Sequence, residues 1–299
     1  AHEACIQFAE QIRKRFEERI FDVGKRSVSL TATVGLCLLT EKIPSAQMVL
    51  EKANEACRQA QADGGNRVQV FDPAAQDKAD AAKDREWLDQ IKNALGKDGF
   101  VLFYQPIVSL QGAEGEFYEV LLRMRGAKGE IMPGVFLPIA ERFGLLPQID
   151  RWVIEHVLRI LQERIKQGRM TTFFVKLTPQ AIDDGTLLPW LAQQLKAARV
   201  PGDRLVFEMP ESKVVTHLKQ AKFFQKGLEQ LRCGFALEQF GSGLNSFQLI
   251  KHVGANYLKL DRTYMSELAK NNENQAKIRD MCEQARALGR MTVAEFVED

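Results

Sequence analysis

The sequence predicts an α/β protein whose larger part is a TIM-like barrel of strands and helices. From Trp87 onward, short apolar runs alternate with stretches of helical spacing, which is typical of a parallel sheet covered by helices on both faces. About seven such units suit a barrel better than a short open sheet. The predicted strands are Phe100–Val108, Phe117–Met124, Thr172–Leu177, Leu205–Met209, Gly234–Leu237, Tyr257–Leu260 and Thr292–Val297, with amphipathic helices such as Arg151–Gln167 and Gln220–Arg232 between most of them.

A smaller α+β unit precedes the barrel. Helical spacing over residues 6–19 is followed by an alternating, β-branched run over Val28–Leu39, which predicts a strand. A second helix is expected from Ala46 to about Ala62, ended by Gly64 and Gly65, and a second strand over Arg67–Phe71. Residues 73–86 are rich in alanine and charged residues and contain no large apolar side chain. We therefore place an exposed linker there, with a composition that is compatible with a helix. The predicted domains are therefore 1–73, a linker at 74–86, and 87–299.

Composition excludes several classes of protein. At 45% hydrophobic and 27% charged residues, the chain is not wholly disordered. The 41 basic residues nearly balance the 39 acidic ones, which gives no reason to expect a nucleic acid or an anionic membrane as partner. No apolar run is long enough to span a membrane, and the first residues carry no signal-peptide pattern. The cysteines are scattered without a Cys-x-x-Cys pair, as in a reduced cytosolic protein that has no zinc site.

Polar side chains occur in or directly after the predicted barrel strands, where an α/β barrel keeps its reactive groups. Carboxylates that converge from separate strands are typical of a divalent-metal site that cleaves phosphodiesters. Any one of these residues alone is better explained as a solvated strand end, whereas the set together favours a common pocket. The set is Glu119, Lys176, Glu208 with Glu211, Glu238, Lys259, and Glu295 with Glu298.

Six short motifs are spread over residues 87–299. They are Tyr104-Gln-Pro-Ile-Val108, Glu119-Val-Leu-Leu-Arg123, Phe207-Glu-Met-Pro-Glu211, Phe240-Gly-Ser-Gly243, Leu258-Lys-Leu-Asp261 and Val293-Ala-Glu-Phe-Val-Glu298. They stand in the order found in EAL domains, and this part of the chain resembles that family of cyclic di-GMP phosphodiesterase barrels. The first 73 residues resemble the C-terminal half of a GGDEF domain, through Val28–Leu39 and residues 63–71. The resemblance also implies a further strand and helix after the last motif, so we expect a barrel that lacks its last strand.

The chain departs from the catalytic pattern that the resemblance implies. Glu119, Glu208, Glu211, Lys259 and Glu295 match metal-site or catalytic positions, but Lys176 replaces an asparagine, and Glu238-Gln239 replaces a pair of aspartates. A two-metal site holds its ions about 3.5–4 Å apart and depends on several carboxylates. Lys176 cannot coordinate a metal, and Gln239 removes a negative charge. We therefore expect no metal and no catalysis, with Lys176 as the counter-ion of the glutamates; the alternative is that Lys176 faces solvent and the metal still binds.

The positions that the resemblance assigns to the nucleotide are better kept. An arginine such as Arg123 can form paired hydrogen bonds with a phosphate or a guanine edge. Asp150 matches a position near a guanine, although capping of the following helix explains it equally well. Phe296 replaces a glycine and can stack on a guanine, the alternative being core packing. The predicted cyclic di-GMP ligands are Gln105, Glu119, Leu121, Arg123, Asp150, Glu295 and Phe296.

Three functional hypotheses remain open. The chain is best explained as a catalytically inactive receptor in the bacterial cytoplasm that binds cyclic di-GMP without a cofactor. By resemblance to receptor-type members of the family, it would relay the signal to a PilZ-domain protein in the control of type IV pili. The alternatives are a slow metal-dependent phosphodiesterase, and an interaction scaffold that has lost nucleotide binding.

Overall fold

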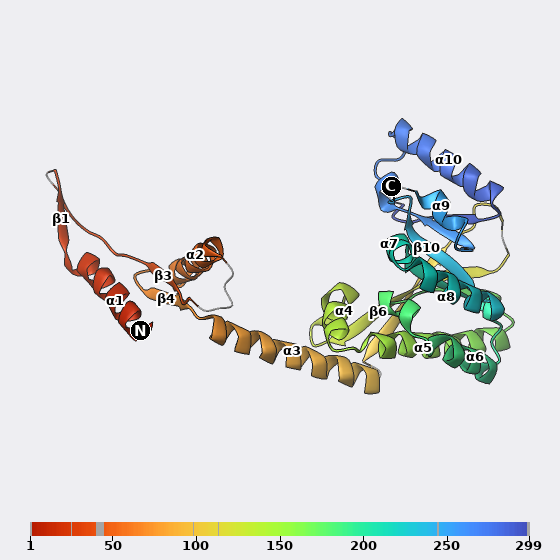
Figure 1. Ribbon diagram of the computed structural model, residues 1–299, viewed down its shortest axis with the longest axis horizontal. Coiled ribbons are helices and arrows are strands. Elements are labelled where there is room, and N and C mark those ends of the chain that lie inside the picture. Colours follow the sequence, from red (N-terminus) through yellow and green to blue (C-terminus); the bar gives the residue numbers. More distant parts are fainter. Residues whose placement is uncertain are drawn as a thin grey trace. The chain divides into compact units, whose positions relative to one another are not determined.

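The computed structural model describes residues 2–24, 26–39, 45–97, 99–112, 114–243 and 245–297. The chain divides into two compact units, Ala1–Glu86 and Trp87–Asp299 (Figure 1). Within the described residues, no helix combines the length and the apolar character needed to cross a lipid bilayer.

Ahead of α3 (Pro73–Gly96), the described residues of the first unit form two helices and two small sheets. Its elements are α1 (His2–Glu18), β1 (Ile20–Val23), β2 (Arg26–Ser29), β3 (Val34–Cys37), α2 (Ala46–Ala62) and β4 (Val68–Phe71). The single strand predicted over Val28–Leu39 is wrong, because its two halves pair with different partners. The first half is antiparallel to β1, and the second is parallel to β4. At the break, Thr33 accepts a hydrogen bond from the Asn66 amide at 3.0 Å, next to the turn that leads into β4.

Helix α3 (Pro73–Gly96) contains the whole predicted linker and continues into the second unit. Its first half is rich in alanine and charged residues, which favour helix even without packing. In its second half, Ile91 is fully buried in the core of the second unit. The linker is therefore the start of a helix whose end is held by tertiary packing.

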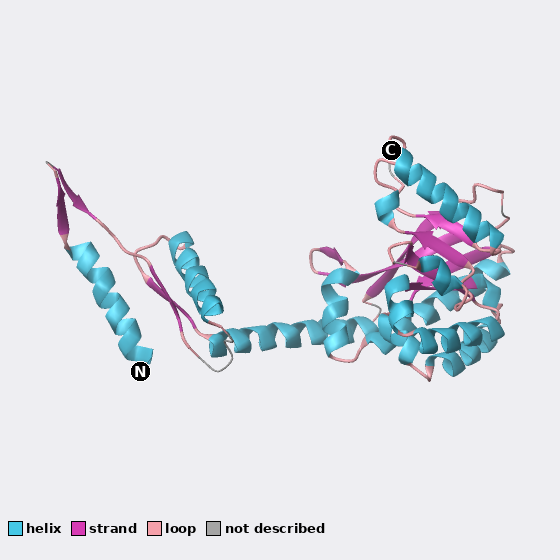
Figure 2. Cartoon of the chain, turned by 45° about the horizontal axis from the view of Figure 1, so that its top comes forward, coloured by secondary structure: helices cyan, strands magenta, loops and turns pink. Residues whose placement is uncertain are grey.

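The second unit contains one sheet whose strands gather at its centre, with helices around them (Figure 2). The strand order is β12–β11–β10–β9–β8–β6–β5, and the short β7 pairs with β6. The strands are β5 (Phe100–Ile107), β6 (Glu116–Gly126), β7 (Gly129–Ile131), β8 (Thr171–Lys176), β9 (Leu205–Pro210), β10 (Gly234–Phe240), β11 (Tyr257–Leu260) and β12 (Met291–Ala294). The helices are α4 (Pro133–Arg142), α5 (Leu146–Lys166), α6 (Leu187–Ala198), α7 (Glu211–Thr216), α8 (Leu218–Gln230), α9 (Ser246–Ile250) and α10 (Asn272–Ala287), with short 3₁₀ turns η1 (Pro179–Asp183), η2 (Gly202–Arg204) and η3 (Arg262–Tyr264).

The sheet differs from the expected all-parallel barrel at one end. Strands β6, β8, β9, β10, β11 and β12 run parallel to one another, but β5 and β7 are both antiparallel to β6. The reason is the short connection on each side of β6, since a parallel pair needs a crossover of a dozen or more residues. Among the described residues the sheet is an open path that ends in β12 and β5.

Alternation along each strand separates the core from the site. On the helix-covered face, Phe173, Phe207 and Phe235 are buried in one large core with residues of α5, α6 and α8. On the opposite face, Phe174, Val206 and Ala236 form a second, smaller cluster. Because side chains repeat every two residues, the next ones along this inner face are Lys176, Glu208 and Glu238. The second cluster therefore forms the floor beneath a group of charged side chains.

Candidate functional site

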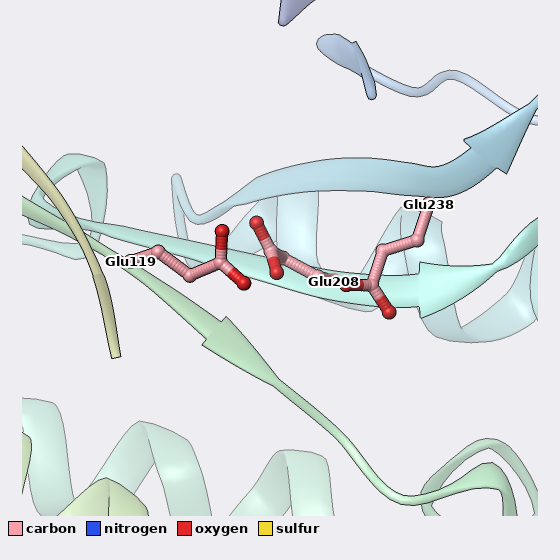
Figure 3. Close-up of side chains that lie close together, drawn as sticks. All are labelled: Glu119, Glu208 and Glu238. Carbon is pink, nitrogen blue, oxygen red and sulfur yellow. The ribbon is translucent and has the colours of Figure 1, made fainter. Parts of the chain in front are cut away.

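Carboxylates from three strands meet above the inner cluster. Glu119 of β6, Glu208 of β9 and Glu238 of β10 point toward one another (Figure 3). Each offers one oxygen such that these oxygens lie within 4.8 Å of one another. All three residues are buried. Carboxylates at this spacing repel one another strongly, so the arrangement needs positive charge among them.

Lys259 of β11 supplies the buried part of that charge. Its side chain is 0% exposed, and its Nζ lies 2.9 Å from Glu119, 2.9 Å from Glu208 and 2.8 Å from Glu295. The contact with Glu208 is made by both carboxylate oxygens, but only Oε2, at 3.1 Å, accepts a hydrogen bond. Oε1 is buried and has no hydrogen-bond partner among the described residues, despite lying close to the amine.

Lys176 of β8 supplies the second positive charge. Its Nζ lies 2.8 Å from Glu119 and 3.7 Å from Glu208, and it donates a hydrogen bond to Glu238. The side chain is 42% exposed, so the ammonium closes the cluster on its open side. The structure thus brings Lys176 onto the glutamates, as expected of a counter-ion, and does not turn it away to solvent.

The charges in the cluster shift one another's proton affinity. Burial acts to raise the pKa of Glu119, but Lys259 and Lys176 together outweigh burial and hold that pKa below its ordinary value. At Glu208 burial prevails over the attraction of Lys259, so its pKa is raised. Burial opposes the charged form of both lysines, yet the surrounding carboxylates raise the pKa of Lys176 and of Lys259. Both amines are therefore held in the charged form.

A divalent cation does not fit among these groups as they lie. Mg²⁺ and Ca²⁺ take oxygen ligands at about 2.0–2.6 Å. The oxygens of Glu119 that would serve as ligands already lie 2.8 Å and 2.9 Å from two ammonium groups. A cation placed on those oxygens would meet both positive charges at close range, so Lys176 would first have to leave.

Asp150 lies beside the cluster and not in it. It sits inside α5, which begins at Leu146, so the helix-capping alternative is wrong. The side chain is buried, and its two oxygens accept hydrogen bonds from the Thr178 amide at 3.0 Å and the Thr178 hydroxyl at 2.6 Å. Burial raises the pKa of Asp150 to about 6, against the opposing effect of those hydrogen bonds. Thr178 is two residues after Lys176, so Asp150 fixes the backbone that carries this lysine.

Glu211 and Gln239 do not join the cluster either. Glu211 is buried, and its Oε2 accepts a hydrogen bond from the Gly241 amide at 2.9 Å. It therefore holds the loop after β10. Gln239 is exposed and has a backbone φ of +54°, which turns it out of the strand. Glu298, the last residue of the sixth motif, lies outside the described residues.

The remaining predicted ligands line the rim around the cluster. Gln105 of β5 is exposed and pairs in register with Glu119. Leu121 and Arg123 follow on the same face of β6, half-buried. The Arg123 guanidinium donates to the Leu122 carbonyl at 2.7 Å and lies 6.0 Å from the centre of the Phe103 ring.

Phe296 follows Glu295 at the end of β12. It is 61% exposed, so the core-packing alternative is wrong. Arg262 lies over its ring. Sequence reasoning missed Arg262 and Thr178, because neither carries a motif signal. Arg262 comes close to Phe296 through the pairing of β11 with β12, and Thr178 comes close to Asp150 through a contact with α5. Both contacts join residues that are far apart in the sequence.

Comparison with known proteins identifies this arrangement. The family model described as EAL domain matches residues 88–299. The EAL domain of FimX from Xanthomonas citri, solved in complex with c-diGMP, has 39% sequence identity and a TM-score of 0.70, covering 74% of this chain and 87% of that one. The EAL domain of FimX from Pseudomonas aeruginosa, bound to c-di-GMP, has 37% identity and a TM-score of 0.67, covering 71% and 86%.

A curated relative, the cyclic di-GMP phosphodiesterase PdeF of Escherichia coli (strain K12), is 32% identical over 71% of this chain and 28% of its own length. The chain spans about a third of the length of curated relatives that it matches. The chain belongs to the EAL domain family, which the match over residues 88–299 shows directly.

Proposed function

We propose that this chain is a cyclic di-GMP receptor that binds the nucleotide without hydrolysing it. The observation that carries the proposal is the position of Lys176, whose ammonium pairs with Glu119, Glu208 and Glu238. These are the carboxylates on which a catalytic metal of this family would depend. With a lysine among them, the chain itself supplies positive charge at the position where a metal would supply it.

The chemistry of hydrolysis explains why this change matters. Attack on a phosphodiester at neutral pH needs a strongly activated water, which metal ions supply by lowering the pKa of a bound water molecule. An ammonium group has no open coordination position and cannot hold a water in this way. Gln239, which replaces a carboxylate and lies exposed, removes a further ligand. We therefore propose that metal is not required and that turnover is absent.

Nucleotide binding is supported by the rim around the cluster. Arg123 can present two parallel N–H groups to a phosphate or to the O6 and N7 atoms of a guanine. Gln105 and Leu121 lie on the same side of the sheet, and Phe296 offers an exposed ring for stacking. Two solved relatives with 39% and 37% identity are bound to this nucleotide. A guanine contact by Asp150 requires it to leave Thr178, so we rank Asp150 below the others.

The second candidate function is a slow phosphodiesterase. The observation in its favour is the convergence of Glu119, Glu208 and Glu238 within 4.8 Å, a donor set that a metal could use if Lys176 moved away. A relative with 32% identity is named a phosphodiesterase. The two candidates differ in one measurable respect, which is the dependence of binding and turnover on a divalent cation.

We further propose that the bound state is relayed to a protein partner in the bacterial cytoplasm. The family resemblance favours a PilZ-domain protein of a type IV pilus system as that partner, and a GGDEF-like origin for residues 1–73. The proposed partner is supported by the likeness of the EAL domain to those of FimX. The proposed GGDEF-like origin is supported by the sequence resemblance of residues 1–73 alone.

Calorimetric titration of cyclic di-GMP into the full chain tests the proposal, first in EDTA and then with Mg²⁺, together with chromatography for a linear product. We expect the same affinity in both buffers and no product. The variant Lys176→Asn with Glu238→Asp and Gln239→Asp is expected to bind Mg²⁺, whereas the control Lys277→Asn, on exposed α10, is not. Binding that appears only with Mg²⁺, or any linear product, would support the phosphodiesterase instead. No binding in either buffer would support the scaffold hypothesis.

A further inference from the structure

We infer that Arg262 and Phe296 form the two walls of a slot that takes one guanine base of the nucleotide. The inference rests on the proposed function, because it names a further contact for the same ligand. Stacking on Phe296 alone leaves one face of the base in solvent. Arg262 would cover that second face with its planar guanidinium, which stacks on aromatic systems and carries a charge suited to a nucleotide.

Strand register places the two residues side by side. Strands β11 and β12 are parallel, and Leu260 and Ala294 are their last paired residues. Arg262 and Phe296 each follow two residues later, so both leave the sheet at the same level. The residue before each of them is anchored, Asp261 through its backbone and Glu295 through its side chain. The Asp261 amide donates to the Phe240 carbonyl at 3.0 Å, and Glu295 pairs with Lys259 at 2.8 Å.

The two groups lie at the distance of a cation–π contact, and this contact has to open slightly to admit a base. The Arg262 guanidinium carbon lies over the Phe296 ring, 6.0 Å from its centre. Non-bonded carbon atoms in contact are about 3.5–4.0 Å apart, so a planar base between two walls needs about 7 Å. The pair therefore has to open by about 1 Å. An exposed phenyl ring can supply that opening by a small rotation.

Both walls are available to a ligand. Phe296 is 61% exposed and Arg262 is exposed, and within the described parts of the chain Arg262 takes part in no ion pair. Phe296 has a backbone φ of +53°, a conformation that is unfavourable for a side chain with a Cβ atom and is concentrated at functional sites. A large apolar residue held in that conformation, yet contributing nothing to the core, is better explained by a ligand than by folding.

A double-mutant cycle on cyclic di-GMP affinity tests the slot, using the full chain and the variants Arg262→Gln, Phe296→Ala and the double variant. We expect Phe296→Ala to weaken binding by about 5- to 100-fold and Arg262→Gln by about 3- to 30-fold, because each removes one stacking face. The double variant should bind only about as weakly as Phe296→Ala, since both walls act on one base. The matched control is Arg279→Gln, an exposed arginine on α10, which should leave affinity unchanged. Melting temperatures without nucleotide should be equal for Arg262→Gln and the wild type.

The outcomes separate the two proposals. If the wild-type chain does not bind cyclic di-GMP, the proposed function fails and the slot fails with it. If the wild type binds and Arg262→Gln binds as tightly as the Arg279→Gln control, the slot is refuted and the receptor stands. Strictly multiplicative losses in the double variant would also refute the slot, because independent contacts do not share a base.

Discussion

Replacing Lys259 by methionine tests whether the buried charge cluster is as tightly balanced as its geometry indicates. Lys259 is 0% exposed, and its amine contacts Glu119, Glu208 and Glu295 at 2.8–2.9 Å. Methionine has nearly the same length and apolar stem, so the substitution removes the charge and leaves the volume. The carboxylates then face one another in a buried site with only Lys176 to oppose them.

The magnitude follows from the burial of the cluster. Removing one partner of a buried ion pair costs about 3–5 kcal/mol, since the remaining charge is left without compensation. With a urea dependence of about 3 kcal/mol per molar, the unfolding midpoint should fall by about 1–2 M. The loss should shrink on acidification. The pKa of Glu119 is lowered in the folded wild type, so its ion pairs add stability above the ordinary carboxyl pKa, and that stability is lost as the pH falls through the lowered pKa.

Urea unfolding followed by tryptophan fluorescence is a suitable assay, because Trp87, Trp152 and Trp190 are the only tryptophans and all lie in the second unit. The matched control is Lys277→Met, which removes an exposed i,i+4 pair with Glu273 and should leave the midpoint unchanged. Equal midpoints for Lys259→Met and Lys277→Met at neutral pH would refute the idea of a tightly balanced buried cluster. A loss that grows on acidification would refute the assigned direction of the Glu119 pKa.

Two further predictions concern the packing of the second unit. Burial raises the pKa of Asp150 to about 6, so the free energy of unfolding of the wild type should decline as the pH rises from about 4 to 6 and this carboxyl ionises. In Asp150→Asn the urea midpoint should depend less on pH across that range. An equal pH dependence in the variant and the wild type would contradict the raised pKa of Asp150. Gly202→Ala should destabilise the second unit by about 1–3 kcal/mol or more, because the added Cβ would lie 1.9 Å from the Leu231 carbonyl oxygen. Gly134→Ala, where nothing lies within 4 Å of the added Cβ, is its control, and equal melting temperatures for the two would argue against this contact.

Periodicity was sufficient to predict the strands of the second unit except the short β7, which was missed. It succeeded for the others because alternation and apolar runs are local features. It failed where pairing decides the structure. The run over Val28–Leu39 has the composition of one strand, but each half finds a different partner, β1 or β4. The side-chain pattern also could not predict that β5 is antiparallel to β6. This direction follows from the short connection to β6, a consequence of chain geometry and not of side-chain type.

In the site, too, some features could be predicted from local sequence and others depend on long-range contacts. Membership of the charged cluster could be predicted for Glu119, Lys176, Glu208, Glu238, Lys259 and Glu295, because parallel strands bring their carboxyl ends to one edge. The sequence could not separate Glu211 and Asp150 from that set. The same residue type serves as a buried carboxylate that accepts backbone hydrogen bonds and as a carboxylate that faces a ligand. Only their partners, the amides of Gly241 and Thr178, distinguish them.

The contact between Asp150 and Thr178 links the core to the proposed function. Thr178 begins the turn η1 after β8, and both of its donors are taken by Asp150, which is held inside the packed helix α5. Lys176 is two residues earlier, and its side chain is partly exposed, so nothing but this backbone and its ion pairs holds the ammonium among the glutamates. Ordering both the backbone and the side chain of a lysine costs about 2.5–4 kcal/mol of conformational entropy. The contact with α5 holds the backbone after Lys176 in place, so the ion pairs of this lysine depend on the packed helix as well as on the glutamates.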